Sequence, residues 1–304
     1  RLAMGDLLGE IQVDALGAGL SDVTSATIDA ALEVASRGVD GLPPLAIIAM
    51  GRWGGRELSY SSDADAIFVI ADTDDPDATR AALSVIGTLR RLLAQPGPDP
   101  ALEIDVDLRP EGKGGPMVRT LSSYRAYYAK WASTWESQAL LRAGVGAGDR
   151  ELGAEFLADV DVVRYPADGL TARQVGEIRR LKARMEAERM PRGTDPKRNV
   201  KLGPGGLSDV EWVVQLLQLR HADAEPSLRT TTTLGALAAE LEAGLVDQAD
   251  AASLAEAWRW ASRIRNATML LRGKASDAIP ADVRELAPVS ELLGYPKGCA
   301  SEFV

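Results

Sequence analysis

Apolar and polar positions along the chain follow two different patterns, and the change falls near residues 119–122. Before it, short apolar runs predict strands, and apolar residues at helical spacing predict helices. The expected strands are 45–50, 64–70 and 101–108, and the expected helices are 5–38 and 76–94. The helix over 5–38 is expected in two pieces, broken around Gly17–Gly19. We therefore expect this part to form an α/β unit with a helical lead.

After the change, apolar residues recur at helical spacing to the end of the chain, with short polar breaks. The expected helices lie near 122–143, 149–159, 171–190, 207–221, 233–243, 248–272 and from 297 onward. A part of this kind is typical of a helical bundle. The sequence therefore predicts an α+β protein with two domains, an α/β domain over residues 1–120 and a helical bundle over residues 121–304.

Composition narrows the classes of protein to which the chain can belong. Its 304 residues are 46% hydrophobic and 26% charged, as in ordinary soluble globular proteins. The lone cysteine, Cys299, excludes a disulfide framework and a cysteine metal site; this fits a reducing cytosol, and we expect a cytoplasmic protein. No apolar run approaches the roughly 20 residues that span a bilayer, so we expect no membrane contact.

The charge balance and the chain ends add two expectations. The formal net charge of −10 argues against a protein that grips a nucleic-acid backbone, because such proteins carry basic surfaces. It leaves room for a local basic pocket that holds a small anionic ligand. The chain opens at Arg1 instead of a methionine and stops without a helix stop signal. We therefore expect a segment of a longer protein, with the helical bundle truncated at its C-terminal end.

Two acids, Asp63 and Asp65, open the apolar run over 64–70. Alternate residues of a strand point to one face, so these carboxylates are expected side by side. They repel each other unless a cation lies between them. Mg²⁺ suits such a pair, because it takes oxygen ligands and leaves room for substrate phosphates.

The strand expected over 101–108 offers a third acid. It alternates strictly, with apolar residues on one face and Glu103, Asp105 and Asp107 on the other. One of these acids beside the first pair would complete a site for two ions about 4 Å apart, as phosphoryl or nucleotidyl transfer requires. The alternative is a solvated polar face on a half-buried sheet.

A glycine-rich turn, Gly51–Arg56, directly precedes the two acids. Glycines let the backbone approach a ligand closely and offer N–H groups to an anion. We interpret the turn as a cradle for nucleotide phosphates; the alternative is a tight strand-to-helix turn, which needs the same glycines. Arg109 and Lys113 lie in a later glycine-rich loop, which is expected either to cover the nucleotide or to form a surface ion pair and connector. The candidate nucleotide-binding residues are Gly51, Arg52, Gly54, Gly55, Arg56, Ser62, Arg109 and Lys113.

Polar residues that would support this site come from later segments. Glu136 and Gln138 lie on a predicted helix, off the face shared by Trp131 and Trp135, which is expected in the core. A glycine-rich segment at 203–206 precedes two further acids, the first of which is more simply interpreted as a helix cap. The supporting candidates are Asp107, Glu136, Gln138, Asp209 and Glu211.

Four segments, in order along the chain, resemble signature segments of the glutamine synthetase adenylyltransferases. This family belongs to the nucleotidyltransferase superfamily, which includes DNA polymerase β. The segments are GRWGGRELSYSSDAD at 51–65, DVDLRP at 105–110, WESQAL at 135–140 and GGLSDVE at 205–211. Four ordered segments make a far more specific match than the Asp-x-Asp pair.

The resemblance implies a polymerase β-like α/β catalytic domain followed by a helical bundle. It implies transfer of AMP from ATP to a tyrosine hydroxyl of glutamine synthetase, with loss of pyrophosphate, which regulates nitrogen assimilation. It also implies two Mg²⁺ ions and places Asp63, Asp65 and Asp105 as the catalytic, metal-binding triad. Asp107 stands where family members often carry an arginine, so its role stays open.

The resemblance leaves the direction of the reaction open. The family enzyme has two homologous halves, of which one attaches AMP and the other removes it by phosphorolysis, releasing ADP. The sequence of residues 208–212, Ser-Asp-Val-Glu-Trp, favours the attaching, C-terminal half. The alternatives are the removing half and a non-catalytic nucleotide-sensing module. The implied partner is glutamine synthetase, and a PII-type signalling protein is a second candidate.

Overall fold

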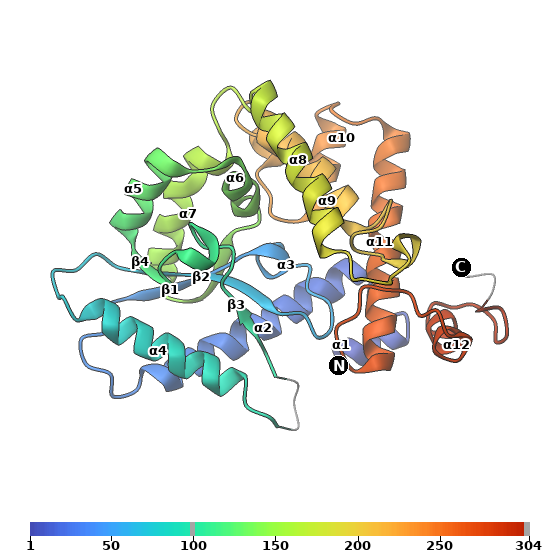
Figure 1. Cartoon of the computed structure of the whole chain (residues 1–304), viewed down its shortest axis with the longest axis horizontal. Helices are drawn as coiled ribbons and strands as arrows, with labels where there is room; N and C mark the ends of the chain where they lie inside the picture. Colours follow the sequence, from blue (N-terminus) through green and yellow to red (C-terminus); the bar gives the residue numbers. More distant parts are fainter. Residues whose placement is uncertain (98–100, 301–304) are drawn as a thin grey trace.

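The computed structural model of the chain describes residues 1–97 and 101–300. A small twisted sheet has helices on both faces, and a further group of helices lies beside it (Figure 1). The protein is a mixed α+β structure that is mostly helical, and at this level the predicted fold class is confirmed. The finer expectation of a polymerase β-like fold stays a prediction.

The sheet is built from strands β1 (Leu45–Ala49), β2 (Ala64–Ile70), β3 (Ile104–Asp105), β4 (Val118–Thr120) and β5 (Gly144–Gly148). Its order is β3-β2-β1-β5, and β4 also pairs with β2. Strand β1 is antiparallel to β2 and β5, whereas β2 runs parallel to β3 and β4. The β2–β3 register places Asp65 opposite Asp105, so strands that are distant in sequence bring these acids together.

The helices fall into two sets. Those around the sheet are α2 (Val13–Ser36), α3 (Gly51–Gly54), α4 (Ala78–Leu93), α5 (Leu121–Trp131), α6 (Thr134–Leu140) and α7 (Arg150–Arg164), and α1 (Leu2–Leu7) contacts α2 at a distance from the sheet. Those beside it are α8 (Ala172–Arg189), α9 (Leu207–His221), α10 (Thr233–Glu242), α11 (Gln248–Arg272) and α12 (Val283–Leu292). Short 3₁₀ turns lie at Gly112–Gly114, Pro196–Arg198 and Pro226–Leu228.

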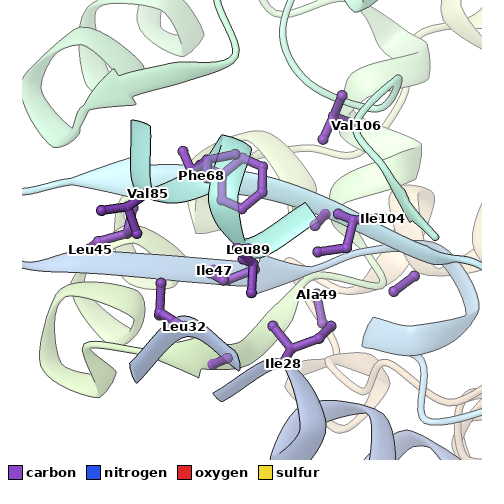
Figure 2. Packing of buried hydrophobic residues seen from close by; sticks show 14 of the residues in the cluster. Ile28, Leu32, Leu45, Ile47, Ala49, Phe68, Val85, Leu89, Ile104 and Val106 are labelled. Atoms are coloured by element: carbon purple, nitrogen blue, oxygen red, sulfur yellow. The ribbon is translucent and has the colours of Figure 1, made fainter. Parts of the chain in front are cut away.

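Both faces of the central strands are buried. Ile47 and Phe68 pack on one face with residues of α2 and α4 (Figure 2), while Ile48 and Ile67 pack on the other with residues of α5 and α7. Burying one such side chain contributes about 1.5–3 kcal/mol, which explains why these strands are continuous apolar runs. Because side chains alternate, Asp65 lies on the same face as Ile67.

The expected break of the first helix around Gly17–Gly19 is wrong. Helix α2 runs through these glycines, and the chain leaves helical geometry between Leu8 and Gln12 instead. A Cβ at Gly17 would lie 3.0 Å from the Glu57 backbone, and one at Gly19 would lie 2.7 Å from the Leu2 side chain. Close packing therefore explains these glycines.

The strand expected over 101–108 shrinks to β3. The Asp105 carboxylate accepts a hydrogen bond from the Asp107 backbone N–H at 2.7 Å, which turns the chain away from the sheet. The Arg109 guanidinium then fixes a tight loop by donating to backbone carbonyls of Val106, Lys113 and Gly115. Local side-chain bonds thus override the alternating pattern.

The helix expected over 122–143 is two helices, α5 and α6, separated at Ala132 and Ser133. Ser133 and Glu136 form a reciprocal capping box that starts α6. The two tryptophans therefore lie on different helices, and the expected core position of Trp131 is wrong, because its side chain is 63% exposed.

Strand β2 and helices α9 and α11 match their predicted bounds. By contrast, β4, β5 and α12 lie outside the predicted elements. Residues 297–300 contain no α-helix, and the rest of the helix expected there lies outside the described residues. The domain boundary near residue 120 stays a prediction, although β5 joins the sheet from beyond it. In the part of the chain that the structure describes, no helix is long and apolar enough to cross a bilayer.

Helix α10 buries a carboxyl group, that of Glu240. Its side chain is fully buried, and neither oxygen has a hydrogen-bond partner among the described residues. Burial raises the pKa of Glu240 from 4.5 to about 8. Between these two pH values, Glu240 is therefore protonated in the native state and ionised in the unfolded chain. The resulting stability is complete below pH 4.5 and is lost as the pH rises through about 8.

Replacing this residue by its neutral isostere, Glu240→Gln, should remove that pH dependence. We expect the variant to unfold with a free energy roughly 2–4 kcal/mol above that of the unsubstituted chain at pH 8.5, because no buried charge forms. At pH 5 the two should differ little. Urea unfolding at both pH values measures this, and an equal difference at both would show that Glu240 does not titrate in this range.

Candidate active site

A cavity of about 270 Å³ lies where the start of β2 meets α6, α9 and α11. Seven of the predicted site residues line it: Gly51, Arg52, Ser62, Asp63, Asp65, Gln138 and Glu211. The other lining residues are Leu108, Trp135, Ala139, Arg142, Leu181, Lys201, Trp212, Gln215 and Arg265. Residues that are far apart in the sequence, from Gly51 to Arg265, thus share one cavity.

The acids at the start of β2 are crowded together. Asp63 and Asp65 line the cavity, and Asp105 is the β3 partner of Asp65. Burial raises the pKa of Asp65, and the charges of Asp63 and Asp105 raise it further, to about 7. No hydrogen bond to the Asp65 carboxylate occurs among residues 1–97 and 101–300. A cation beside these oxygens would relieve both the burial and the repulsion.

The carboxylates suit a hard divalent cation by their chemistry, because Mg²⁺ takes oxygen ligands. Asp105 is engaged with the backbone of its own loop through the Asp107 N–H. Within the described ranges, no three acid, histidine or cysteine side chains are already close enough together to hold a metal ion. The metal triad of Asp63, Asp65 and Asp105 therefore stays a prediction, which the crowding of the three charges favours.

The glycine-rich turn brings the backbone against the acids. Gly51 has φ +51°, and a Cβ there would collide with Asp65 Oδ2. A Cβ at Gly54 or Gly55 would instead collide with the backbone carbonyl or the guanidinium of Arg142. Gly51 thus lets the Asp65 carboxylate reach the turn, while Gly54 and Gly55 permit close packing on Arg142.

Gly51→Ala should damage the site and the fold together. The new methyl group meets Asp65, and the left-handed backbone is unfavourable for alanine, so we expect a loss of roughly 1–3 kcal/mol in unfolding free energy. Any activity that depends on Asp65 should fall by about 100-fold or more. The matched control is Gly87→Ala on the exposed face of α4, where a Cβ meets nothing within 4 Å. That change should stabilise the chain by up to about 1 kcal/mol. Equal effects of the two changes would contradict the role assigned to Gly51.

Buried ion pairs tie the sheet side of the cavity to the helical side. Arg52 Nη2 lies 2.7 Å from Glu211 Oε1 on α9, and Arg142 Nη1 lies 3.5 Å from the same oxygen. Arg142 also pairs with Glu57, whose carboxylate accepts the Thr233 N–H at the start of α10 at 2.5 Å. Burial would raise the pKa of Glu211, but these arginines hold it below its usual value. The network fixes the walls of the cavity.

Part of the helical wall is neutral and partly aromatic. Gln138 Nε2 donates to Gln215 Oε1 at 2.8 Å, joining α6 to α9. Trp135 and Trp212 also line the cavity. Flat rings and amides of this kind suit a nucleobase, which needs stacking surfaces and a few hydrogen-bonding groups.

Three cations predicted for phosphate binding do not line the cavity. Arg56 pairs with Asp22 on α2, with its Nη1 2.7 Å from Asp22 Oδ1. The Arg109 guanidinium donates its hydrogen bonds to backbone carbonyls of its own loop. Lys113 is exposed, and its Nζ lies 3.1 Å from Asp107 Oδ2. Lys113 thus forms the surface ion pair given above as the alternative, whereas Arg109 is buried and holds its own loop together.

Three supporting candidates also lie away from the cavity: Asp107, which pairs with Lys113, and the acids Glu136 and Asp209. Glu136 caps α6 and accepts a hydrogen bond from the Tyr127 hydroxyl at 2.9 Å. Asp209 pairs with Lys182 and accepts the Gly205 N–H at 2.7 Å. Glu136 and Asp209 thus organise local structure.

Several cavity residues were not predicted, among them Lys201, Trp212, Gln215 and Arg265. Lys201 opens the glycine-rich segment before α9, a signal similar to that of the first turn. Arg265 lies in the middle of α11, where nothing in the local sequence distinguishes it from a surface arginine.

Comparison with known proteins places these features in a family. Residues 1–159 match the family model of glutamate-ammonia ligase adenylyltransferase, and residues 178–303 match that of GlnD PII-uridylyltransferase.

Curated relatives agree. The chain is 55% identical over 304 residues to a bifunctional glutamine synthetase adenylyltransferase/adenylyl-removing enzyme of Cutibacterium acnes, covering 100% of this chain and 31% of the relative. Proteins of the same name from Streptomyces avermitilis and Mycobacterium avium are 57% and 49% identical, over 94% and 100% of this chain and 29% and 32% of the relatives. The chain thus spans about a third of the length of these relatives. With its first half matched by the family model, the chain belongs to the glutamate-ammonia ligase adenylyltransferase family of enzymes.

Proposed function

We propose that the chain transfers AMP from ATP to a tyrosine hydroxyl of glutamine synthetase, by nucleotidyl transfer on a polymerase β-like domain over residues 1–120. One observation carries the proposal: the carboxylates of Asp63 and Asp65 line a cavity that also holds a glycine turn and several cations, and Asp105 lies beside Asp65 in the β2–β3 register. The names of the relatives support the choice of acceptor.

The acids are proposed to hold divalent cations, with Asp63, Asp65 and Asp105 as ligands. Bound Mg²⁺ would supply charge neutralisation of the phosphates and a lower pKa for the attacking hydroxyl. The chain itself supplies the position of these carboxylates. The β2–β3 register sets Asp65 beside Asp105, and Gly51 leaves space for the Asp65 carboxylate.

The cavity walls are proposed to orient ATP. The triphosphate would lie along the Gly51 turn and Arg52, which Glu211 holds in place at 2.7 Å. The adenine would lie toward Trp135, Trp212 and the paired amides of Gln138 and Gln215. Positioning and preorganised charge of this kind account for most of the acceleration in phosphoryl-type transfers.

A second candidate function is the removal of AMP. The relatives' names include both activities, and phosphorolysis of AMP-tyrosine to ADP would use the same acids and a phosphate anion in the same cavity. A non-catalytic module that senses nucleotide is a third candidate. The second family match favours a PII-type signalling protein as a further partner, bound by the proposed helical domain over residues 121–304. The lone cysteine supports a cytoplasmic setting.

Two parallel reactions test the direction. In one, the chain is mixed with unmodified glutamine synthetase, Mg²⁺ and ATP labelled at the α-phosphorus. In the other, it is mixed with adenylylated glutamine synthetase, Mg²⁺ and inorganic phosphate. Our proposal expects label on the protein in the first reaction and little ADP in the second. The reverse result would assign the removing activity, and ATP binding without turnover in either would assign a sensing module.

A further inference from the structure

The helical wall of the cavity carries two cations, Lys201 and Arg265, that form no salt bridge with Glu211 among the described residues, although the charges of both interact with it at longer range. Lys201 lies in the loop before α9, and Arg265 lies on α11. Both line the same cavity as Asp63 and Asp65. The cavity therefore has Asp63 and Asp65 on its sheet wall, and Lys201 and Arg265 beside Glu211 on its helical wall.

Arg265 is buried with an unused donor. Its side chain is 7% exposed, and its Nε donates to Asp277 Oδ1 at 2.6 Å. Its Nη1 is buried and has no hydrogen-bond partner in the described part of the chain. A guanidinium stays charged in proteins and carries five N–H donors, so a buried unpaired donor is costly unless a ligand accepts from it. An anion in the cavity would satisfy it.

Lys201 is held near Arg265 by its backbone. Asn199 Oδ1 accepts the Lys201 N–H at 3.0 Å, and the Val200 N–H donates to the Asp277 carbonyl at 2.8 Å. Asp277 thus fixes both the loop of Lys201 and the Arg265 guanidinium. Among residues 1–97 and 101–300, no carboxylate oxygen lies within 4.0 Å of Lys201 Nζ. Its charge acts on Asp65, Glu211 and Asp277 only at longer range, so no close ion pair blocks a ligand from the ammonium group.

We propose that Lys201 and Arg265 form a phosphate-binding site for the terminal phosphates of ATP or for free inorganic phosphate. The inference rests on the proposed function. In transfer from ATP, the tyrosine oxygen bonds to the α-phosphorus and the bond from that phosphorus to the bridging oxygen breaks. The electron pair leaves with pyrophosphate, and the hydroxyl proton passes to water. Cations beside the leaving phosphates neutralise the charge that develops there, and an arginine fork matches two phosphate oxygens.

The test is calorimetric binding of four probes with Mg²⁺: ATP, pyrophosphate, inorganic phosphate and AMP. Lys201→Gln should weaken ATP and pyrophosphate binding about tenfold or more, and AMP binding less than twofold, because AMP lacks the terminal phosphates. A tenfold loss confined to inorganic phosphate would identify free phosphate as the ligand. Unchanged binding of ATP, pyrophosphate and inorganic phosphate, or a loss of AMP binding equal to that of ATP, would overturn the proposal.

Two further variants keep the test sharp. Lys197→Gln removes the same charge from an exposed position in the preceding 3₁₀ turn and should leave all four affinities within twofold. Arg265→Lys retains the charge that Asp277 needs but loses the fork, so it should stay folded and still weaken pyrophosphate binding about tenfold. Because these readouts are binding constants, failure of AMP transfer to glutamine synthetase would leave the phosphate site testable.

Discussion

Asp65→Asn is expected to lower AMP transfer by about 1,000-fold or more while leaving the fold intact. The change keeps the shape of the side chain and removes one negative charge from the proposed cation site, where each ligand interaction supplies several kcal/mol to the transition state. Burial and the charges of Asp63 and Asp105 raise the pKa of Asp65 to about 7, so a cation is expected to bind most directly at this carboxylate. Steady-state label transfer from ATP measures the effect.

The same variant gives a stability readout. Without Mg²⁺ at pH 8, the asparagine chain should be at least as stable as the unsubstituted one, because a buried, repelled charge is gone. Added Mg²⁺ should stabilise the unsubstituted chain and not the variant. Asp77→Asn, an exposed residue at the start of α4, is the matched control and should keep activity within twofold. Full activity in the Asp65 variant would eliminate the proposed triad.

Glu57→Ala is expected to cost about 3–5 kcal/mol of unfolding free energy. Glu57 is buried, pairs with Arg142 and accepts both the N–H and the hydroxyl of Thr233. Its loss leaves the buried Arg142 guanidinium without its main partner. It also leaves the Thr233 N–H at the start of α10 without a hydrogen-bond acceptor. Urea unfolding measures the loss.

The control for this change is Glu155→Ala, which breaks the exposed pair between Glu155 and Arg125. Surface pairs contribute about 0–1 kcal/mol, so that variant should remain near the unsubstituted chain. Similar losses for both variants would mean that the buried network does not connect the two sides of the cavity.

The two central strands, β1 and β2, could be predicted because their burial is strong and local. Both are buried on both faces, so β1 is an unbroken apolar run and β2 is apolar at every position except Asp65. Strand β5 could not be predicted in this way, since it reads Gly-Val-Gly-Ala-Gly. A Cβ at Gly146 would lie 2.5 Å from the Trp53 ring. A tertiary contact therefore selects glycine against the ordinary preference of strands.

The site residues likewise divide into those that local sequence predicts and those that tertiary contacts place. The Asp63–Asp65 pair and the Gly51 turn lie within one short segment, so their chemistry was visible in sequence. Arg56 and Arg109 were expected on phosphate, but partners on α2 and in the loop after β3 engage them. Arg265 reaches the cavity through the packing of α11, which no local pattern encodes.

The most direct measurement of the central claim is mass spectrometric mapping of glutamine synthetase after incubation with this chain, ATP and Mg²⁺. We predict one AMP group on a tyrosine, formed with an equal amount of pyrophosphate and absent when the Asp65→Asn chain is used. Unmodified glutamine synthetase, or AMP that appears equally with the Asp65→Asn chain, would contradict it.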